Sequence, residues 1–184
     1  MKKLGQNRAA ATAILIIVAI IAVPLLGGMR LALANGSIEK DFAKTVKATD
    51  RHGNDLYSDT DKIIIYAKSI LEEGTRLAAD DISVRERGDR LQKAIDECSG
   101  ANGAIARYTS SEALTAEARQ FLNALRGSTS DQLTSYKAEL ESQSKRIERV
   151  YRQAYTDMLT RRDDLLSGFP AAQIAALFGI GGGK

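Results

Sequence analysis

The chain has 184 residues, with 26 Lys and Arg against 23 Asp and Glu, and it contains one His and one Cys. A single Cys excludes an intramolecular disulfide scaffold and zinc sites built from several thiolates, and a single His excludes His-rich metal sites. The charged fraction of 27% and hydrophobic fraction of 44% are typical of a globular protein. This length predicts one compact domain with an appendage.

The most apolar part of the chain follows a short basic N-terminus, residues 1–8. Residues 9–29 carry no charge, and Arg8 and Arg30 flank them. As a helix this stretch rises about 31 Å, close to the thickness of a bilayer's hydrocarbon core. We therefore predict a transmembrane helix over 9–29 that contacts the lipid bilayer, followed by a linker over 30–37.

A cleavable signal peptide is the alternative interpretation of this segment. Lys2 and Lys3 provide a basic start, and Ala32-Leu33-Ala34 provides a small-residue cleavage site before Asn35. A secreted helical protein would follow from cleavage. The charge-free run is longer than the usual hydrophobic region of about 7–15 residues, which favours an uncleaved single-pass anchor. The basic residues lean slightly toward a cytoplasmic N-terminus and an extracytoplasmic domain in a bacterial envelope.

The remainder of the chain is predicted to be all-α. No proline occurs between Pro24 and Pro170, and strand and hairpin signals are missing. We expect four helices, over about 38–77, 81–98, 110–126 and 131–167. Their short connections predict an antiparallel up-and-down four-helix bundle over 38–168. Gly53 is expected to weaken the middle of the first helix.

Hydrophobic spacing and capping signals support these boundaries. Thr109-x-x-Glu112 resembles a capping box before the third helix, and Gly168 with Pro170 ends the fourth. The inward face of the second helix is expected to hold Ile82, Leu91, Ala94, Ile95 and Cys98. The inward stripe of the fourth is expected to hold Leu133, Tyr136, Leu140, Ile147, Val150, Ala154 and Met158.

The C-terminal segment, 169–184, is apolar and ends in a Gly-rich tail. Its run Phe169-Pro170-x4-Ala175-x2-Phe178-Gly179-Ile180 resembles the C-terminal signature of the LemA family, and Arg152-Gln-Ala-Tyr155 resembles an upstream element of that family. Thr156, Arg162-Asp163 and Ile180 depart from the family pattern. The resemblance implies a divergent member with an N-terminal membrane anchor and a four-helix bundle, and it implies no activity. We expect residues 171–180 to cover one end of the bundle; insertion into the membrane interface is the alternative.

The residues capable of chemistry do not form a recognisable catalytic pattern. His52 is expected at the surface, and Asp50, Asp55, Asp59 and Asp61 are expected on a solvated helix face because their spacing does not match a calcium loop. Cys98 is expected to be a buried, inert thiol. The end of the chain, 179–184, lacks the residues and following helix of a phosphate-binding loop. We therefore predict no catalytic, cofactor-binding or metal-binding residues.

Basic residues gather in the last predicted helix without forming a nucleic-acid site. Acidic residues alternate with Arg146, Arg149, Arg152, Arg161 and Arg162, so a solvated face is expected. The four basic residues at 2, 3, 8 and 30 flank the charge-free run, which leaves 22 of the 26 against all 23 acids. The net charge of +3 therefore belongs to the edges of the predicted membrane segment.

These features favour a non-enzymatic, membrane-anchored interaction or envelope-organising protein. Its partners would be the lipid bilayer through 9–29 and an unidentified protein, with self-association left open and nucleic acid excluded. A ligand-binding or sensory bundle is the second hypothesis, because helical bundles can hold a small molecule between their helices. An enzyme is the third and least favoured.

Overall fold

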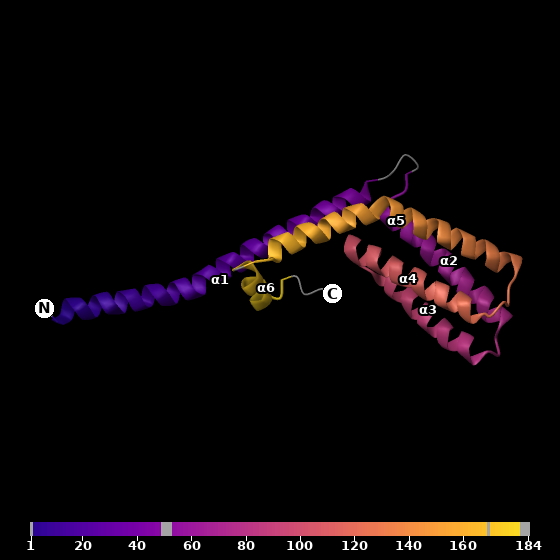
Figure 1. Ribbon diagram of the computed structural model, residues 1–184, viewed down its shortest axis with the longest axis horizontal. Coiled ribbons are helices and arrows are strands. Elements are labelled where there is room, and N and C mark those ends of the chain that lie inside the picture. Colours follow the sequence, from indigo (N-terminus) through magenta and orange to yellow (C-terminus); the bar gives the residue numbers. More distant parts are fainter. Residues whose placement is uncertain (1, 49–52, 169, 181–184) are drawn as a thin grey trace. The chain divides into compact units, whose positions relative to one another are not determined.

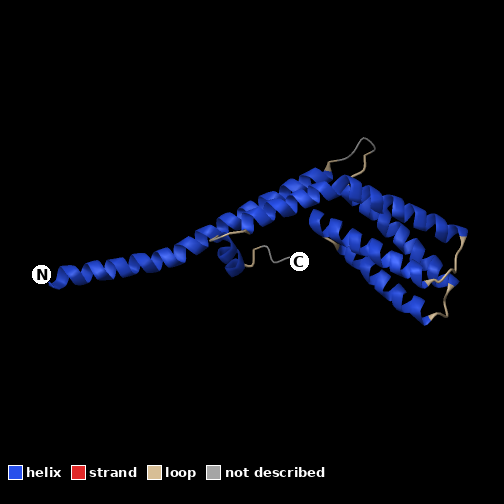
Figure 2. Ribbon diagram, in the orientation of Figure 1, coloured by secondary structure: helices blue, strands red, loops and turns tan. Residues whose placement is uncertain are grey.

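The computed structural model describes residues 2–48, 53–168 and 170–180, and within α1 it describes side chains at residue 22 and from residue 24 onward. All regular elements in these ranges are helices, as Figure 2 shows. They are α1 (Lys2–Lys47), α2 (Leu56–Leu77), α3 (Ile82–Gly100), α4 (Ala104–Ala124), α5 (Asp131–Leu166) and α6 (Ala171–Phe178). The predicted all-α class is confirmed.

The chain divides into two compact units. One consists of residues 41–157, and the other combines residues 1–40 with 158–184. Helices α1 and α5 contribute residues to both units. Residues 30–37, the expected linker, are helical and belong to α1.

The unit 41–157 is a helical bundle. In Figure 1, α2, α3, α4 and the first part of α5 alternate in direction, as their short connections require. The core is formed by large aliphatic and aromatic side chains from each of these helices, among them Ile63, Ile70, Leu91, Ile95, Leu114, Phe121 and Leu140. Burial of such side chains is the main favourable term in folding.

Two glycines allow helices to approach closely inside this bundle. A Cβ placed on Gly74 of α2 would lie 2.8 Å from the Phe121 Cζ atom of α4, a distance that real side chains avoid. A Cβ on Gly88 of α3 would lie 3.3 Å from Leu71 Cδ1. Glycine at position 74 is therefore needed for the fit of Phe121, and a side chain at position 88 would require Leu71 to shift by a few tenths of an ångström.

The first bundle helix differs from its prediction. Instead of one helix over 38–77, α1 ends at Lys47 and α2 begins at Leu56. A capping box starts α2: Asp55 Oδ1 accepts from the Ser58 backbone N–H at 2.8 Å, and Ser58 Oγ accepts from the Asp55 N–H at 2.9 Å. Gly53 has φ of 74°, so the predicted weak point is a break.

The third helix begins earlier than predicted. It starts at Ala104 rather than near 110, and the Thr109 hydroxyl donates to the Ile105 carbonyl at 3.0 Å, inside the helix. The predicted capping box at Thr109 and Glu112 is therefore wrong. Hydroxyls of Ser and Thr have this competing backbone acceptor one turn earlier, and the sequence alone does not distinguish the two uses.

Two predicted core positions are also wrong, although most of the predicted stripes are confirmed. Ile82 is 71% exposed because it is the first residue of α3. Val150 is 44% exposed, and Tyr151 is buried in its place. Leu91, Ile95, Leu133, Leu140 and Ile147 are buried as expected.

In the other unit, α6 packs against α1. A Cβ on Gly27 would lie 2.8 Å from Ile174 Cδ1, and a Cβ on Gly28 would lie 2.7 Å from Phe178 Cε2. Gly179, with φ of 64°, ends α6 in the left-handed conformation. Within its unit, α6 thus lies on the end of the charge-free run, a neighbour that we did not predict.

Among the helices whose residues are described, none is both long and apolar enough to cross a membrane. The side chains of residues 9–21 and 23, which make up most of the predicted transmembrane helix, lie outside that description.

Candidate functional site

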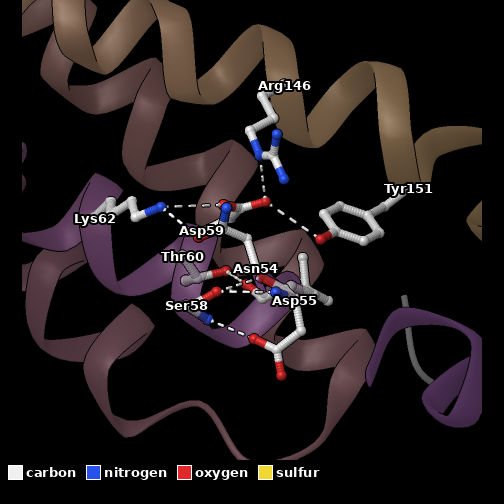
Figure 3. A network of polar contacts seen from close by, with 9 residues as sticks. Asn54, Asp55, Ser58, Asp59, Thr60, Lys62, Arg146 and Tyr151 are labelled. Carbon is white, nitrogen blue, oxygen red and sulfur yellow. Dashed lines mark hydrogen bonds and ion pairs between the residues drawn. The ribbon is translucent and has the colours of Figure 1, made fainter. Parts of the chain in front are cut away.

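The most unusual polar group of the bundle is a buried carboxylate on α2. Asp59 has no solvent exposure. Its Oδ2 atom accepts hydrogen bonds from Arg146 Nε at 2.8 Å and from the Tyr151 hydroxyl at 3.2 Å (Figure 3). Both donors come from α5, 87 and 92 residues further along the chain, so Asp59 joins α2 to α5. We call Asp59, Lys62, Arg146 and Tyr151 the Asp59 cluster.

The second oxygen of Asp59 faces a lysine. Lys62 Nζ lies 3.7 Å from Asp59 Oδ1 and donates a hydrogen bond to Asn54 Oδ1 at 2.7 Å. Figure 3 shows Lys62 approaching from the side opposite to Tyr151. Asp59 Oδ1 has no hydrogen-bond partner within the described residues. Two cations therefore face one buried carboxylate, and their attraction offsets part of the cost of removing it from water.

The surroundings of Tyr151 keep its phenol protonated. Burial raises the pKa of Tyr151, and the nearby Asp59 carboxylate raises it further. The hydroxyl is consequently a permanent donor to Asp59 near neutral pH. Near Tyr151 on α5, the ring of Tyr155 stacks on Tyr108 of α4, with the ring centroids 4.5 Å apart. The ring centroid of Phe42 of α1 lies 5.9 Å from that of Tyr155. Tyr155 is thus at the centre of an aromatic cluster.

A second ion-pair cluster connects α2 and α5 at the other end of α2. Glu73 accepts two hydrogen bonds from Arg76, at 2.7 and 2.9 Å, and a third from the Ser130 hydroxyl at 2.6 Å. Arg76 and then Ser130 lower the pKa of Glu73 to about 2. The Ser130 hydroxyl also accepts from the Leu133 backbone N–H at 3.1 Å and so caps the start of α5.

A bidentate pair links α4 to α5. Arg119 donates to both oxygens of Glu141, at 2.7 and 2.8 Å, and this contact lowers the pKa of Glu141. Lys145 lies four residues after Glu141, at the spacing of an ion pair within one helix. The tertiary partner is stronger because the planar guanidinium matches both carboxylate oxygens.

The acidic residues of the first region separate into different environments. Asp55 caps α2, Asp59 is buried, and Asp61 is exposed and pairs with Arg107 Nη1 at 3.1 Å. The expectation of a solvated face is therefore wrong for Asp59. Asp50 and His52 lie outside the described residues.

The remaining candidates are placed as follows. Cys98 is fully buried, and burial raises the pKa of its thiol, as expected for an inert cysteine. Arg152 pairs with Glu148 on the same helix, in agreement with a solvated face, whereas Arg146 belongs to the Asp59 cluster. Within the described part of the chain, no group of three or more His, Cys, Asp or Glu side chains gathers where a metal ion could bind.

The Asp59 cluster was not predicted, because no residue next to Asp59 in the sequence indicates that its side chain is buried. The available signal was positional: Leu56, Ile63, Ala67 and Ile70 define an inward stripe, and Asp59 lies three residues after Leu56 and four before Ile63 on that same face. A carboxylate on an apolar stripe needs a cationic partner when it is buried, and Arg146 of α5 is that partner.

Chemically, the cluster holds helices together. Asp59 Oδ2 accepts hydrogen bonds from both Arg146 and Tyr151, so this carboxylate serves the α2–α5 contact. In comparisons with known proteins, no family model, no curated protein and no solved structure matches the chain.

Proposed function

We propose that the protein is a membrane-anchored helical bundle with a non-enzymatic interaction or envelope-organising role. One observation carries the proposal: α1 contains the charge-free run 9–29 near its start and the buried bundle residues Phe42 and Val46 near its end. A single helix that combines an apolar run of bilayer length with core positions is suited to attach a bundle to a membrane.

The exposed side chains near the end of the run support an apolar environment. Leu25, Leu26 and Met29 are all more than half exposed. Clusters of large exposed apolar side chains are uncommon on soluble proteins and indicate contact with a membrane or a partner. Arg30, directly after the run, supplies a positive charge of the kind that lipid phosphates attract.

The interaction role rests on how the charged groups of the bundle are used. Asp59 and Glu141 each bind an arginine of another helix, and Glu73 accepts from the Ser130 hydroxyl that caps α5. Such contacts fix the shape of the bundle and leave its exposed helix faces for a partner. The LemA resemblance, on Arg152, Tyr155, Pro170, Ala175 and Phe178, supports the anchored bundle and supplies no activity.

Alkaline extraction of membranes tests the anchor. We expect the full chain to stay in the membrane pellet, and Ala19→Arg, at the middle of the run, to move a large share to the supernatant because a central Arg costs about 2.5–3.5 kcal/mol in insertion. Ser135→Arg adds the same charge at an exposed position of α5 and is the matched control. Extraction of the unaltered chain would contradict the proposal.

Crosslinking in intact membranes tests the interaction role. A photoreactive side chain on an exposed face of α5, such as position 135, is expected to capture one protein reproducibly, and the same probe at buried Leu140 is expected to capture none. Equal labelling from both positions, or none from either, would argue against a partner that binds this face.

A further inference from the structure

We propose that α6 is an interfacial membrane helix, which lies at the boundary between lipid headgroups and acyl chains beside the end of the charge-free run. The inference rests on the proposed anchor and extends it to a second, separate segment of the chain. It concerns residues 170–180 and 22–34, which belong to the same unit.

The packing of α6 determines its depth relative to the run. Ile174 contacts α1 at Gly27, and Phe178 contacts it at Gly28. Both glycines belong to the last turn of the run 9–29, immediately before Arg30. Whatever medium surrounds residues 27 and 28 therefore also surrounds α6. If the run spans the bilayer, this level is the membrane interface.

The contact itself has the character of a helix pair in lipid. In membranes, small residues allow backbones to approach closely, because packing rather than water exclusion drives association. Gly27 and Gly28 perform this role here, since any Cβ at either position would collide with α6. The buried side of α6 is completed by Ala175.

The outer side of α6 is apolar as well. Leu177 is 74% exposed and Phe178 is 45% exposed, and no residue from 171 to 180 is charged. Together with Met29 and Ala32 of α1, Phe178 and Ile180 line an open apolar groove. The exposed Leu33 extends the apolar surface beyond Arg30.

A lipid surface fits this patch better than a protein partner does. The apolar surface is continuous with the charge-free run, and the only charge within it is the basic Arg30, which suits lipid phosphate. The apolar face of an interfacial helix is buried about 5–10 Å into the boundary between headgroups and acyl chains. A second copy of the chain is the competing occupant, and the experiment below distinguishes it.

The chain has no tryptophan, so one introduced Trp reports on one position. We would place Leu177→Trp, in the full chain, in phosphatidylcholine vesicles brominated either near the headgroup or near the chain end. We expect blue-shifted emission and a greater loss of emission with the shallow bromines. Ala19→Trp reports on the run and should be quenched mainly by the deep bromines, and Ser135→Trp reports on the bundle and should not be quenched.

The outcomes separate the two proposals. Quenching of Ala19→Trp without quenching of Leu177→Trp overturns the interfacial helix and leaves the anchor intact. Absence of quenching in Ala19→Trp overturns both. Blue-shifted but unquenched emission from Leu177→Trp overturns the lipid assignment in favour of a protein cover, including a second copy. Helical circular dichroism of each variant verifies that it is folded.

Discussion

The Ser130 hydroxyl donates a 2.6 Å hydrogen bond to Glu73 and at the same time caps α5. One side chain therefore joins the start of α5 to the last turns of α2. The same two helices are joined again by Arg146 and Asp59, nearly four turns away along α2. The pairing of α2 with α5 is thus fixed by polar contacts near both of its ends.

The low pKa of Glu73 predicts a specific pH dependence of stability. Arg76 and Ser130 lower this pKa from 4.5 to about 2. The stabilisation by the Glu73 carboxylate is complete above pH 4.5 and is lost as the pH falls through about 2. Urea unfolding of the full chain in detergent should therefore show a smaller decrease in stability over this range for Glu73→Gln than for the unaltered protein.

Glu72→Gln is the matched control, because Glu72 is the exposed neighbour of Glu73. It should retain the pH dependence of the unaltered chain. Identical pH profiles for the unaltered chain and Glu73→Gln would contradict the assigned role of Glu73.

Loss of Arg146 should destabilise the bundle strongly. Arg146→Leu leaves the buried Asp59 carboxylate without its closest cation, and breaking a buried ion pair in this way costs about 3–5 kcal/mol. The decrease in the urea midpoint measures it. Arg149→Leu, on the exposed face of α5, should change stability by less than about 0.5 kcal/mol.

A double substitution separates the contribution of the ion pair from the cost of burying an unpaired charge. In Asp59→Leu with Arg146→Leu, both charges are gone, and much of the stability lost in Arg146→Leu should return. If the double variant were less stable than Arg146→Leu, the lower stability of Arg146→Leu could not be explained by the unpaired charge of Asp59.

Gly74 should not tolerate even one added methyl group. Alanine normally stabilises a helix by about 0.5–1 kcal/mol relative to glycine. At position 74 the new Cβ would collide with Phe121, and overpacking of a core costs about 1–3 kcal/mol. Gly74→Ala should therefore lower the thermal midpoint, whereas Gly100→Ala, with open space around its Cβ, should leave it unchanged or raise it.

Cys98 should react with thiol reagents only when the bundle opens. The side chain is buried, and burial raises its pKa, so little thiolate is accessible. With Ellman's reagent at neutral pH, we expect slow labelling of the unaltered chain and rapid labelling in urea. Ser135→Cys should add one rapidly labelled thiol, and rapid labelling of the native unaltered chain would contradict burial.

The sequence was sufficient for the helical class, for most inward positions of α3 and α5, and for the burial of Cys98. Periodicity is informative there because long amphipathic helices repeat the signal over many turns. The helix boundaries were predicted wrongly where the same residue types can either cap a helix or lie inside it. Thr109 donates to a carbonyl inside α4 and does not cap its start. The helix expected over 38–77 is two helices: α1 ends at Lys47, and a capping box of Asp55 and Ser58 starts α2.

The Asp59 cluster could not be predicted from local sequence, because it depends on which helix lies opposite α2. Arg146 and Tyr151 are about 90 residues away, and only the tertiary pairing of α2 with α5 gives Asp59 its partners. The same applies to α6, whose position depends on two glycines at the distant end of the charge-free run.

The intact mass of the protein recovered from alkali-washed membranes tests the central claim, attachment of the bundle through α1, most directly. The account predicts a membrane-retained chain of 19.9 kDa that still includes residues 9–29. A shorter chain that begins at Asn35 and is released in soluble form would contradict it.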